Sequence, residues 1–179
     1  MTSRTLGVVP GTLPPALTAI EVQMSALDMV VQWRRCGIVA DYLADYLALS
    51  FEQPDYARSV LSTVANELVE NAVRFSAEKA RPIRIHASHR GDVVELVVSN
   101  LSNQRHVEGL EKLFLDLSRD DLAAVFRERV EAGTRGGLGL LLLAKDYGAE
   151  LGAVVVSQET DTRAVTMHVV LPAKELVQS

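Results

Sequence analysis

The chain has 179 residues, of which 48% are hydrophobic and 23% are charged. This is the composition of an ordinary globular domain, and it excludes a chain that is disordered throughout. Eighteen lysines and arginines against 23 aspartates and glutamates give a formal net charge of -5, which argues against a general nucleic-acid binder because affinity for phosphates needs an excess of cations.

The cysteine content and the length of the apolar runs indicate in which cellular compartment the protein is expected. The chain has a single cysteine, Cys36, so it has no internal disulfide and no cysteine cluster for zinc, which favours a reducing environment. The longest uninterrupted apolar run, residues 138–144, is far shorter than the roughly 20 residues that a membrane-spanning helix needs. Prolines interrupt the apolar stretch near the N-terminus, which makes it a poor signal-peptide core. We therefore expect a cytoplasmic protein that binds neither nucleic acid nor a membrane.

The first part of the chain is expected to contain a lead-in, strands and two helices. Residues 1–16 hold three prolines and two glycines, which indicate an extended or disordered segment outside the domain. A loose alternation of apolar and polar residues predicts a strand over 18–24, and residues 29–33 are a candidate second strand. Apolar residues at helical spacing predict helices over 37–51 and 55–75.

The remainder of the chain is expected to alternate between strands and helices. Residues 82–88 and 93–99 alternate as strands on either side of Gly91, which predicts an antiparallel hairpin. A polar segment with two short helical patterns follows, and then a glycine-rich stretch that opens a helix. The elements expected in this part, after the hairpin, are helices over 108–117 and 120–131, a helix ending near residue 147, and strands over 153–157 and 164–171.

This order of elements predicts the fold class. We expect one α+β domain over residues 17–174, built as a two-layer α/β sandwich in which helices cover one face of a mixed, mostly antiparallel sheet.

Glu67 and Asn71 are the first candidate site residues. They are four residues apart on the helix predicted over 55–75, so their side chains lie one turn above each other at the margin of its apolar face. A carboxylate and a carboxamide placed in this way can polarise a water molecule and bind Mg²⁺, which prefers oxygen ligands. The solvated rim of an ordinary helix has the same pattern, so these two residues alone leave both interpretations open.

The second candidate is a glycine-rich turn. Gly136, Gly137 and Gly139 follow Arg135 and open a predicted helix. Glycines let backbone amides approach an anion closely, and the helix N-terminus adds the positive end of its dipole. The guanidinium of Arg135 is suited to contact a phosphate oxygen. A tight turn with close packing between helix and sheet is the alternative explanation of the same glycines.

Taken together, the two segments resemble the GHKL ATPase superfamily, which includes histidine-kinase catalytic domains, gyrase and Hsp90 nucleotide domains, and bacterial anti-sigma-factor serine kinases. ELVENAVRFS resembles its N box and RGGLGLLLLAKDYGAELG its G2 box, and the resemblance covers about residues 55–171. It implies the Bergerat ATP-binding fold. Carried over by position, it implies that Glu67 is the catalytic residue that orders or deprotonates water, that Asn71 binds Mg²⁺, and that Gly137 and Gly139 line the phosphates, beside Arg135 and Gly136.

The sequence departs from the superfamily between these boxes. An Asp-x-Gly-x-Gly segment normally follows a strand there, and its Asp accepts a hydrogen bond from the adenine amine. Here Asn100 stands at the Asp position, where its oxygen still accepts but without a charge, which weakens the bond by about 1 kcal/mol. Ser102 and Gln104 replace the glycines, which restricts positive backbone φ. Asn103 can adopt the left-handed conformation and would partly compensate.

The resemblance leaves two functional hypotheses. The compact size is most similar to the anti-sigma-factor and serine/threonine-kinase branch, which implies a cytoplasmic regulator that holds ATP and Mg²⁺, binds and sometimes phosphorylates a small regulatory protein partner, and forms a homodimer. In the alternative, the chain is a nucleotide-free pseudo-ATPase that acts as a protein-interaction module. Residues 101–136 would be the lid, which opens and closes in the first hypothesis, and in the second covers an empty pocket or offers a partner-binding surface.

Overall fold

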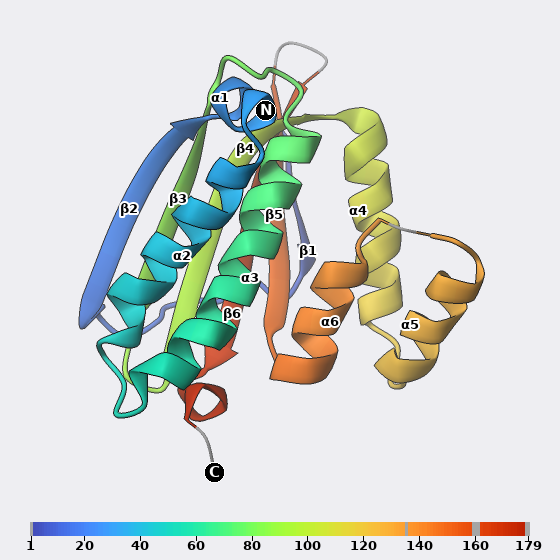
Figure 1. Cartoon of the computed structure of the whole chain (residues 1–179). Helices are drawn as coiled ribbons and strands as arrows, with labels where there is room; N and C mark the ends of the chain where they lie inside the picture. The colour runs from blue at the N-terminus through green and yellow to red at the C-terminus, as the bar shows by residue number, and fades with distance from the viewer. Residues whose placement is uncertain (1, 135, 159–161, 178–179) are drawn as a thin grey trace.

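One antiparallel sheet forms the base of the molecule. The computed structural model describes residues 2–134, 136–158 and 162–177. Every neighbouring pair of strands in the sheet is antiparallel, and their order is β1-β5-β6-β4-β3-β2 (Figure 1). The strands are β1 (Ser3–Gly7), β2 (Thr18–Ser25), β3 (Pro82–His89), β4 (Val93–Asn103), β5 (Glu150–Ser157) and β6 (Thr162–Pro172).

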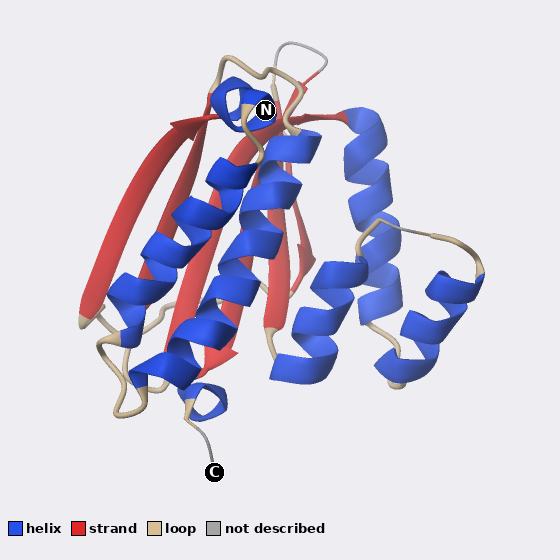
Figure 2. Cartoon of the chain, in the orientation of Figure 1, coloured by secondary structure: helices blue, strands red, loops and turns tan. Residues whose placement is uncertain are grey.

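The helices lie on one face of this sheet, so the two-layer α+β sandwich expected from the sequence is confirmed (Figure 2). In the described ranges of the chain, no helix is long and apolar enough to cross a bilayer. The helices are α1 (Ala26–Val31), α2 (Arg34–Ala48), α3 (Pro54–Phe75), α4 (Gln104–Leu117), α5 (Leu122–Glu131), α6 (Leu138–Tyr147) and a short 3-10 helix, η1 (Ala173–Leu176).

Helix α3 carries much of the core and one half of the candidate site. Pro54 occupies its first turn, where a missing N–H costs nothing, and Asp55 complements the positive end of the helix dipole. Its apolar residues recur every three or four positions and face the sheet, where Leu61 and Val64 are 1% and 0% exposed. Burying a side chain of this size stabilises the fold by about 1.5–3 kcal/mol.

The lead-in expected over residues 1–16 is extended, but part of it belongs to the sheet. Ser3–Gly7 forms the edge strand β1, which pairs with β5 from Ser3 opposite Val156 to Gly7 opposite Gly152. The prolines that suggested a segment outside the domain lie in the connection that follows, before β2. The partner of β1 lies far along the chain, so the local sequence does not reveal the pairing. The expectation that residues 1–16 lie outside the domain was therefore wrong for Ser3–Gly7.

The second strand expected near the N-terminus is also wrong. Residues 26–31 form the short helix α1, in which Met29 is buried. Trp33 follows it at 39% exposure, with the guanidinium of Arg74 5.8 Å from the ring centroid. A short apolar run does not distinguish a strand from a helical turn by its periodicity, because either can be buried.

Helix α2 buries one face and leaves an apolar stripe on the other. Its buried residues include Cys36, Leu43 and Leu47, whereas an opposite face made of large apolar side chains is open to solvent. The exposed fractions along that face are 60% for Ile38, 55% for Tyr42 and 41% for Tyr46, and Leu49, which caps the C-terminus of the helix, is 81% exposed. We refer to these four residues as the α2 stripe.

Candidate functional site

A cavity of 350 Å³ lies beneath α4, between α3, the start of α6 and the strands β4 and β6. This volume is within the range of roughly 300–1,000 Å³ that small-molecule sites occupy. Most of the wall is apolar, and the polar groups come from the candidate motifs and from the lid. The lining includes Leu68, Ala72, Phe75, Val98, Leu110, Leu113, Val165 and Met167 among apolar residues, and Asn71, Asn100, Ser102, Arg105, His106, Lys112, Arg129 and Thr134 among polar ones.

Glu67 and Asn71 are held together on α3 as their spacing predicted. The amide Nδ2 of Asn71 donates to Oε1 of Glu67 over 2.7 Å. The carboxylate of Glu67 also packs on Gly139 so closely that a β-carbon at Gly139 would overlap it. Gly139 therefore lies directly against the tip of the Glu67 side chain, which agrees with the close-packing explanation of that glycine.

The predicted motifs meet, but they divide between two hollows. Asn71, Asn100, Gly136 and Gly137 line the cavity. Glu67 and Gly139 line a second hollow of 410 Å³ on the other side of the contact between α3 and α6. The amide hydrogen bond between Asn71 and Glu67 crosses that boundary, so a group bound at Asn71 would be one side chain away from the carboxylate.

The glycine turn is built around Gly137. This residue caps the N-terminus of α6 in the left-handed conformation, with φ of 80°, which favours glycine. Leu113 of α4 packs against its Cα, and an added β-carbon would lie 2.9 Å from the Leu113 side chain. The first amides of α6 have no carbonyl partner within the helix, so they are suited to an anion. Arg135, predicted to contact a phosphate, lies outside the described residues.

The segment that replaces the Asp-x-Gly-x-Gly box needs no glycine. Strand β4 pairs with β6 as far as Asn103, and α4 begins at the next residue, Gln104. Asn103 is extended, with φ of -98°, and caps α4 by accepting from the backbone amide of His106 over 2.9 Å. The left-handed conformation expected at Asn103 is therefore wrong. Ser102 is buried and donates to the carbonyl of Phe75 over 3.0 Å, which anchors the strand to the end of α3.

Asn100 faces the cavity, at the position predicted to bind a base. Its Nδ2 donates to the carbonyl of Leu101 over 3.3 Å. This bond uses one of the two N–H groups, so the carboxamide keeps an N–H donor and its oxygen as an acceptor.

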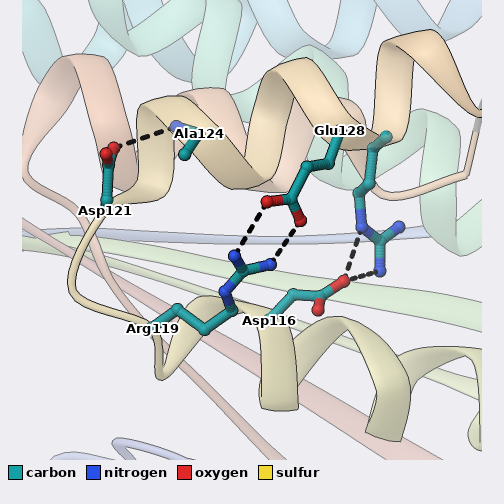
Figure 3. A network of polar contacts seen from close by, with 6 residues as sticks. Asp116, Arg119, Asp121, Ala124 and Glu128 are labelled. Atoms are coloured by element: carbon teal, nitrogen blue, oxygen red, sulfur yellow. Dashed lines mark hydrogen bonds and ion pairs between the residues drawn. The ribbon is translucent and has the colours of Figure 1, made fainter.

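The predicted lid contains a helical hairpin made of α4 and α5. Two hydrogen bonds of 2.6 and 2.9 Å join Arg119 to Glu128, and Asp121 caps α5 through the amide of Ala124 (Figure 3). The bond from Arg119 lowers the pKa of the Glu128 carboxyl. The side chains of the pair are about half exposed, so the pair contributes little to stability.

Arg129 connects the lid to the glycine turn. Its guanidinium bonds the Asp116 carboxylate of α4 over 2.7 Å, and its Nη1 donates to the carbonyl of Gly136 over 2.8 Å. Only 14% of this side chain is exposed. One cation therefore holds α4, α5 and the turn in a fixed relation along the rim of the cavity.

The cavity also contains residues that the sequence did not single out. Arg105, Lys112 and Arg129 bring three cations from the lid to it, and His106 and Phe75 close one end. Their rings lie 4.9 Å apart between centroids. The lysines and arginines of the lid segment were visible in the sequence and could have suggested a site for phosphates. Helical spacing alone, however, does not show which of these side chains face the cavity. In the part of the chain that the structure describes, no group of three or more His, Cys, Asp or Glu side chains could hold a metal ion.

Comparison with known proteins gives a family and a fold. A family model described as histidine kinase-, DNA gyrase B- and HSP90-like ATPase matches residues 56–175. The chain superposes on a chain of the SiaB–SiaC complex from Pseudomonas aeruginosa with a TM-score of 0.65 and 16% sequence identity, covering 87% of this chain and 91% of the other. Identity at this level supports the fold alone. No curated protein sequence matches.

Proposed function

This chain belongs to the family of histidine kinase-, DNA gyrase B- and HSP90-like ATPases, and from that premise we propose that it is a cytoplasmic regulator that binds ATP with Mg²⁺ and acts on a small protein as a serine/threonine kinase or anti-sigma-type switch. The observation that carries the proposal is the shared cavity. Asn71 from the N box, Asn100 from the base position and two glycines from the G2 box line it together, although they come from three parts of the chain.

The chemistry of the cavity suits a nucleotide. Phe75 and the apolar residues around it can receive a flat base, and Asn100 offers an acceptor oxygen beside them. Arg105, Lys112 and the free amides at the start of α6 can hold phosphates. The carboxamide oxygen of Asn71 is a ligand that Mg²⁺ accepts. When bound, ATP would supply the phosphoryl group and Mg²⁺ would neutralise charge that develops on it.

Glu67 is the proposed proton acceptor. Its carboxylate is fixed by the amide of Asn71 and by close packing on Gly139. A carboxylate whose position is fixed in this way can orient a hydroxyl or water and remove its proton, provided that the acceptor atom lies within hydrogen-bond reach. Its place beside the second hollow suggests that the protein substrate approaches from that side.

A nucleotide-free pseudo-ATPase is the second candidate, and one observation favours it. Where relatives have a glycine hinge, β4 passes directly into α4, and Arg129 ties the resulting hairpin to the glycine turn. A lid anchored in this way could remain closed and serve as a surface for another protein.

Isothermal titration with ATP and Mg²⁺ separates the two candidates. We expect binding heat at millimolar nucleotide or below for the unaltered protein, and loss of its Mg²⁺ dependence in Asn71→Ala. Asn66→Ala is a matched control, because Asn66 makes the same kind of bond to Glu70 on α3, over 3.1 Å, but does not line the cavity. If the unaltered protein does not bind ATP up to several millimolar, the kinase hypothesis is wrong and the nucleotide-free interaction module is the remaining candidate.

We also propose that the chain forms a homodimer through the α2 stripe. An exposed row of large apolar side chains on one helix is typical of an interface. Charges beside the stripe indicate a second copy: Arg34 stands at the N-terminal end of α2, and Asp41 and Asp45 lie further along, at the surface beside Arg58. An antiparallel pair of α2 helices would place the cation of each copy near the carboxylates of the other, as a twofold interface requires.

The dimer is tested by the mass of the protein in solution. Light scattering after size exclusion should give twice the chain mass for the unaltered protein and the chain mass for Tyr42→Glu. Tyr56→Glu, at a site on α3 that is 38% exposed and outside the stripe, should remain dimeric. A monomeric unaltered protein, or a Tyr42→Glu variant that stays dimeric, would contradict this interface.

A further inference from the structure

The second hollow lies between facing sides of α3 and α6, which run in opposite directions (Figure 1). The residues that α6 contributes recur every three or four positions, as one face of a helix does. The lining consists of Gly139, Leu142, Leu143, Asp146 and Tyr147 from α6, Ser62, Thr63, Asn66 and Glu67 from α3, and Gly37 from α2. The hollow therefore follows α6 for about two turns.

A carboxylate stands near each end of this hollow. The tip of the Glu67 side chain lies against Gly139, in the first turn of α6. Asp146 comes two turns later on the same face, which is roughly 10 Å further along the helix axis. Leu142 lies between them and is partly exposed. An extended chain covers this length in about three residues, so a segment that follows the hollow meets a carboxylate, an apolar side chain and a second carboxylate.

The polar groups of the hollow present acceptors to a ligand. Ser62 donates its hydroxyl proton to a carboxylate of α2 over 2.6 Å, and Thr63 donates its own to a carbonyl one turn earlier in α3 over 3.0 Å. Both hydroxyl oxygens therefore keep only lone pairs for a ligand. Among the described residues that line the hollow, the charged ones are Glu67 and Asp146. The complement of such a surface is a segment that supplies hydrogen-bond donors and a positive charge.

The nearest cation leaves Asp146 accessible. Lys145 pairs with Asp146, but 29% and 43% of the two side chains are exposed. The ammonium group of Lys145 also lies 5.9 Å from the ring centroid of Phe126, on the side of α6 that faces α5. An ion pair at the surface contributes little free energy, so a cation that enters the hollow can bind the same carboxylate.

We propose that the second hollow binds an extended segment of the protein substrate, in which a lysine or arginine stands three residues from the serine or threonine that is phosphorylated. The hydroxyl lies at Glu67 and the cation at Asp146, which makes Asp146 a specificity-determining residue. This inference rests on the proposed function and specifies its substrate. Phosphoryl transfer joins the hydroxyl oxygen to the γ-phosphorus of ATP, releases ADP and passes the hydroxyl proton to Glu67.

The test measures which peptides the protein phosphorylates. A library of peptides has a fixed central serine or threonine, and each flanking position in turn is lysine, arginine, alanine or glutamate. With ATP and Mg²⁺, we expect the unaltered protein to favour lysine and arginine three residues from the centre, on one side, by about two- to fivefold over alanine, which is the range that an exposed ion pair supplies. Glutamate there should be the poorest.

Three variants assign this preference to one side chain. Asp146→Lys should reverse it, so that glutamate becomes the favoured residue at that position, and Asp146→Asn should abolish it. A loss of packing would instead lower transfer to all peptides alike. Asp92→Lys is the matched control, because Asp92 is exposed in the turn between β3 and β4 and does not line the hollow. It should keep the preference of the unaltered protein.

The outcomes separate this inference from the function on which it rests. An unaltered preference in Asp146→Lys, or no preference for a cation in the unaltered protein, would overturn the inference while leaving kinase activity in place. If the protein binds ATP in calorimetry but phosphorylates no peptide of the library, the hollow is not a site for a substrate segment and the inference is wrong, whereas nucleotide binding stands. No binding of ATP would overturn the proposed function itself, and this inference with it.

Discussion

The two groups of helices that cover the sheet differ in how they are held. Helices α2 and α3 lie over β2, β3 and β4, whereas the α4–α5 hairpin lies toward the β1 edge (Figure 1). Nine residues of α3 are buried, against three of α4 and one of α5. Among the polar contacts of the hairpin, those of the mostly buried Arg129 hold it to the glycine turn, whereas the exposed Arg119–Glu128 pair contributes little. The cavity is therefore bounded by a firmly packed wall on one side and a weakly packed one on the other.

This difference indicates where the molecule can open. Segments with few buried apolar contacts open at lower free energy than the core, and ligand-binding lids are drawn from them. We expect the α4–α5 hairpin to separate from the sheet without unfolding of α3, which would widen the entrance to the cavity.

The largest effect should follow from removing a core side chain on the firm wall. Leu61→Ala in α3, where the leucine is 1% exposed, should lower the free energy of unfolding by about 2–5 kcal/mol because it leaves a cavity in the core. Leu115→Ala in α4, where the leucine is 70% exposed, is the matched control and should change stability little. Urea unfolding measures the stability of both variants. A similar loss of stability in Leu61→Ala and Leu115→Ala would contradict the difference between the two groups of helices.

A glycine pair tests the junction of the two groups. Gly139→Ala should lower the free energy of unfolding by about 0.5–1.5 kcal/mol, because the methyl group overlaps the Glu67 carboxylate and displaces it from its hydrogen bond with Asn71. Gly109→Ala, in α4, meets no atom within 4 Å and should stabilise the helix by up to about 1 kcal/mol. Thermal and urea unfolding would show opposite signs, and a neutral Gly139→Ala would mean that the contact is looser than it looks.

Arg129 allows the weak wall to be loosened alone. Arg129→Ala should lower the free energy of local opening of α5 by about 1–3 kcal/mol, since it leaves the buried side of Asp116 and the Gly136 carbonyl without their donor. Hydrogen exchange should accelerate in α4 and α5 and stay unchanged in α3. Arg119→Ala removes an exposed pair and should leave hydrogen exchange in the hairpin nearly unchanged. Equal acceleration in α3 would show that the two walls open together.

The smallest effect concerns acid. The pKa of His106 is lowered in the folded protein from an ordinary value of 6.5, so below pH 6.5 the unfolded chain binds a proton more readily than the folded one. The free energy of unfolding should therefore decrease as the pH falls from about 7 to 5, and His106→Phe should lack this part of the decrease. Urea unfolding at several pH values measures the slope of the free energy of unfolding against pH for the unaltered protein and for His106→Phe. Equal slopes for the two proteins would contradict the prediction.

Much of the fold was predictable, and the two failures have separate causes. The long helix with Glu67 and Asn71, the β3–β4 hairpin and both lid helices follow from periodicity, because each buries one face on its own local pattern. Strand β1 was missed because its partner lies in β5, and α1 because a short apolar run fits either a strand or a turn of helix. The N-terminal part therefore carries the errors.

The candidate site divides in the same way. Its motifs, with Glu67, Asn71 and the glycines, were visible in the sequence because their residue types and order are specific as a pair. His106 and the three cations were not, since which face of a lid helix turns inward depends on how Leu113 and Phe114 pack.

The order of helices and strands from α2 onward, the α+β class and the two nucleotide-type motifs were thus determined by the sequence alone, through periodicity and local chemistry that need no distant partner. The tertiary structure alone decided that Asn71 and the glycine turn share one cavity while Glu67 and Gly139 face another, and that β4 continues into α4 without a hinge. Those outcomes depend on contacts between segments that are far apart in the chain. The free energy of such contacts cannot be predicted from a local sequence pattern.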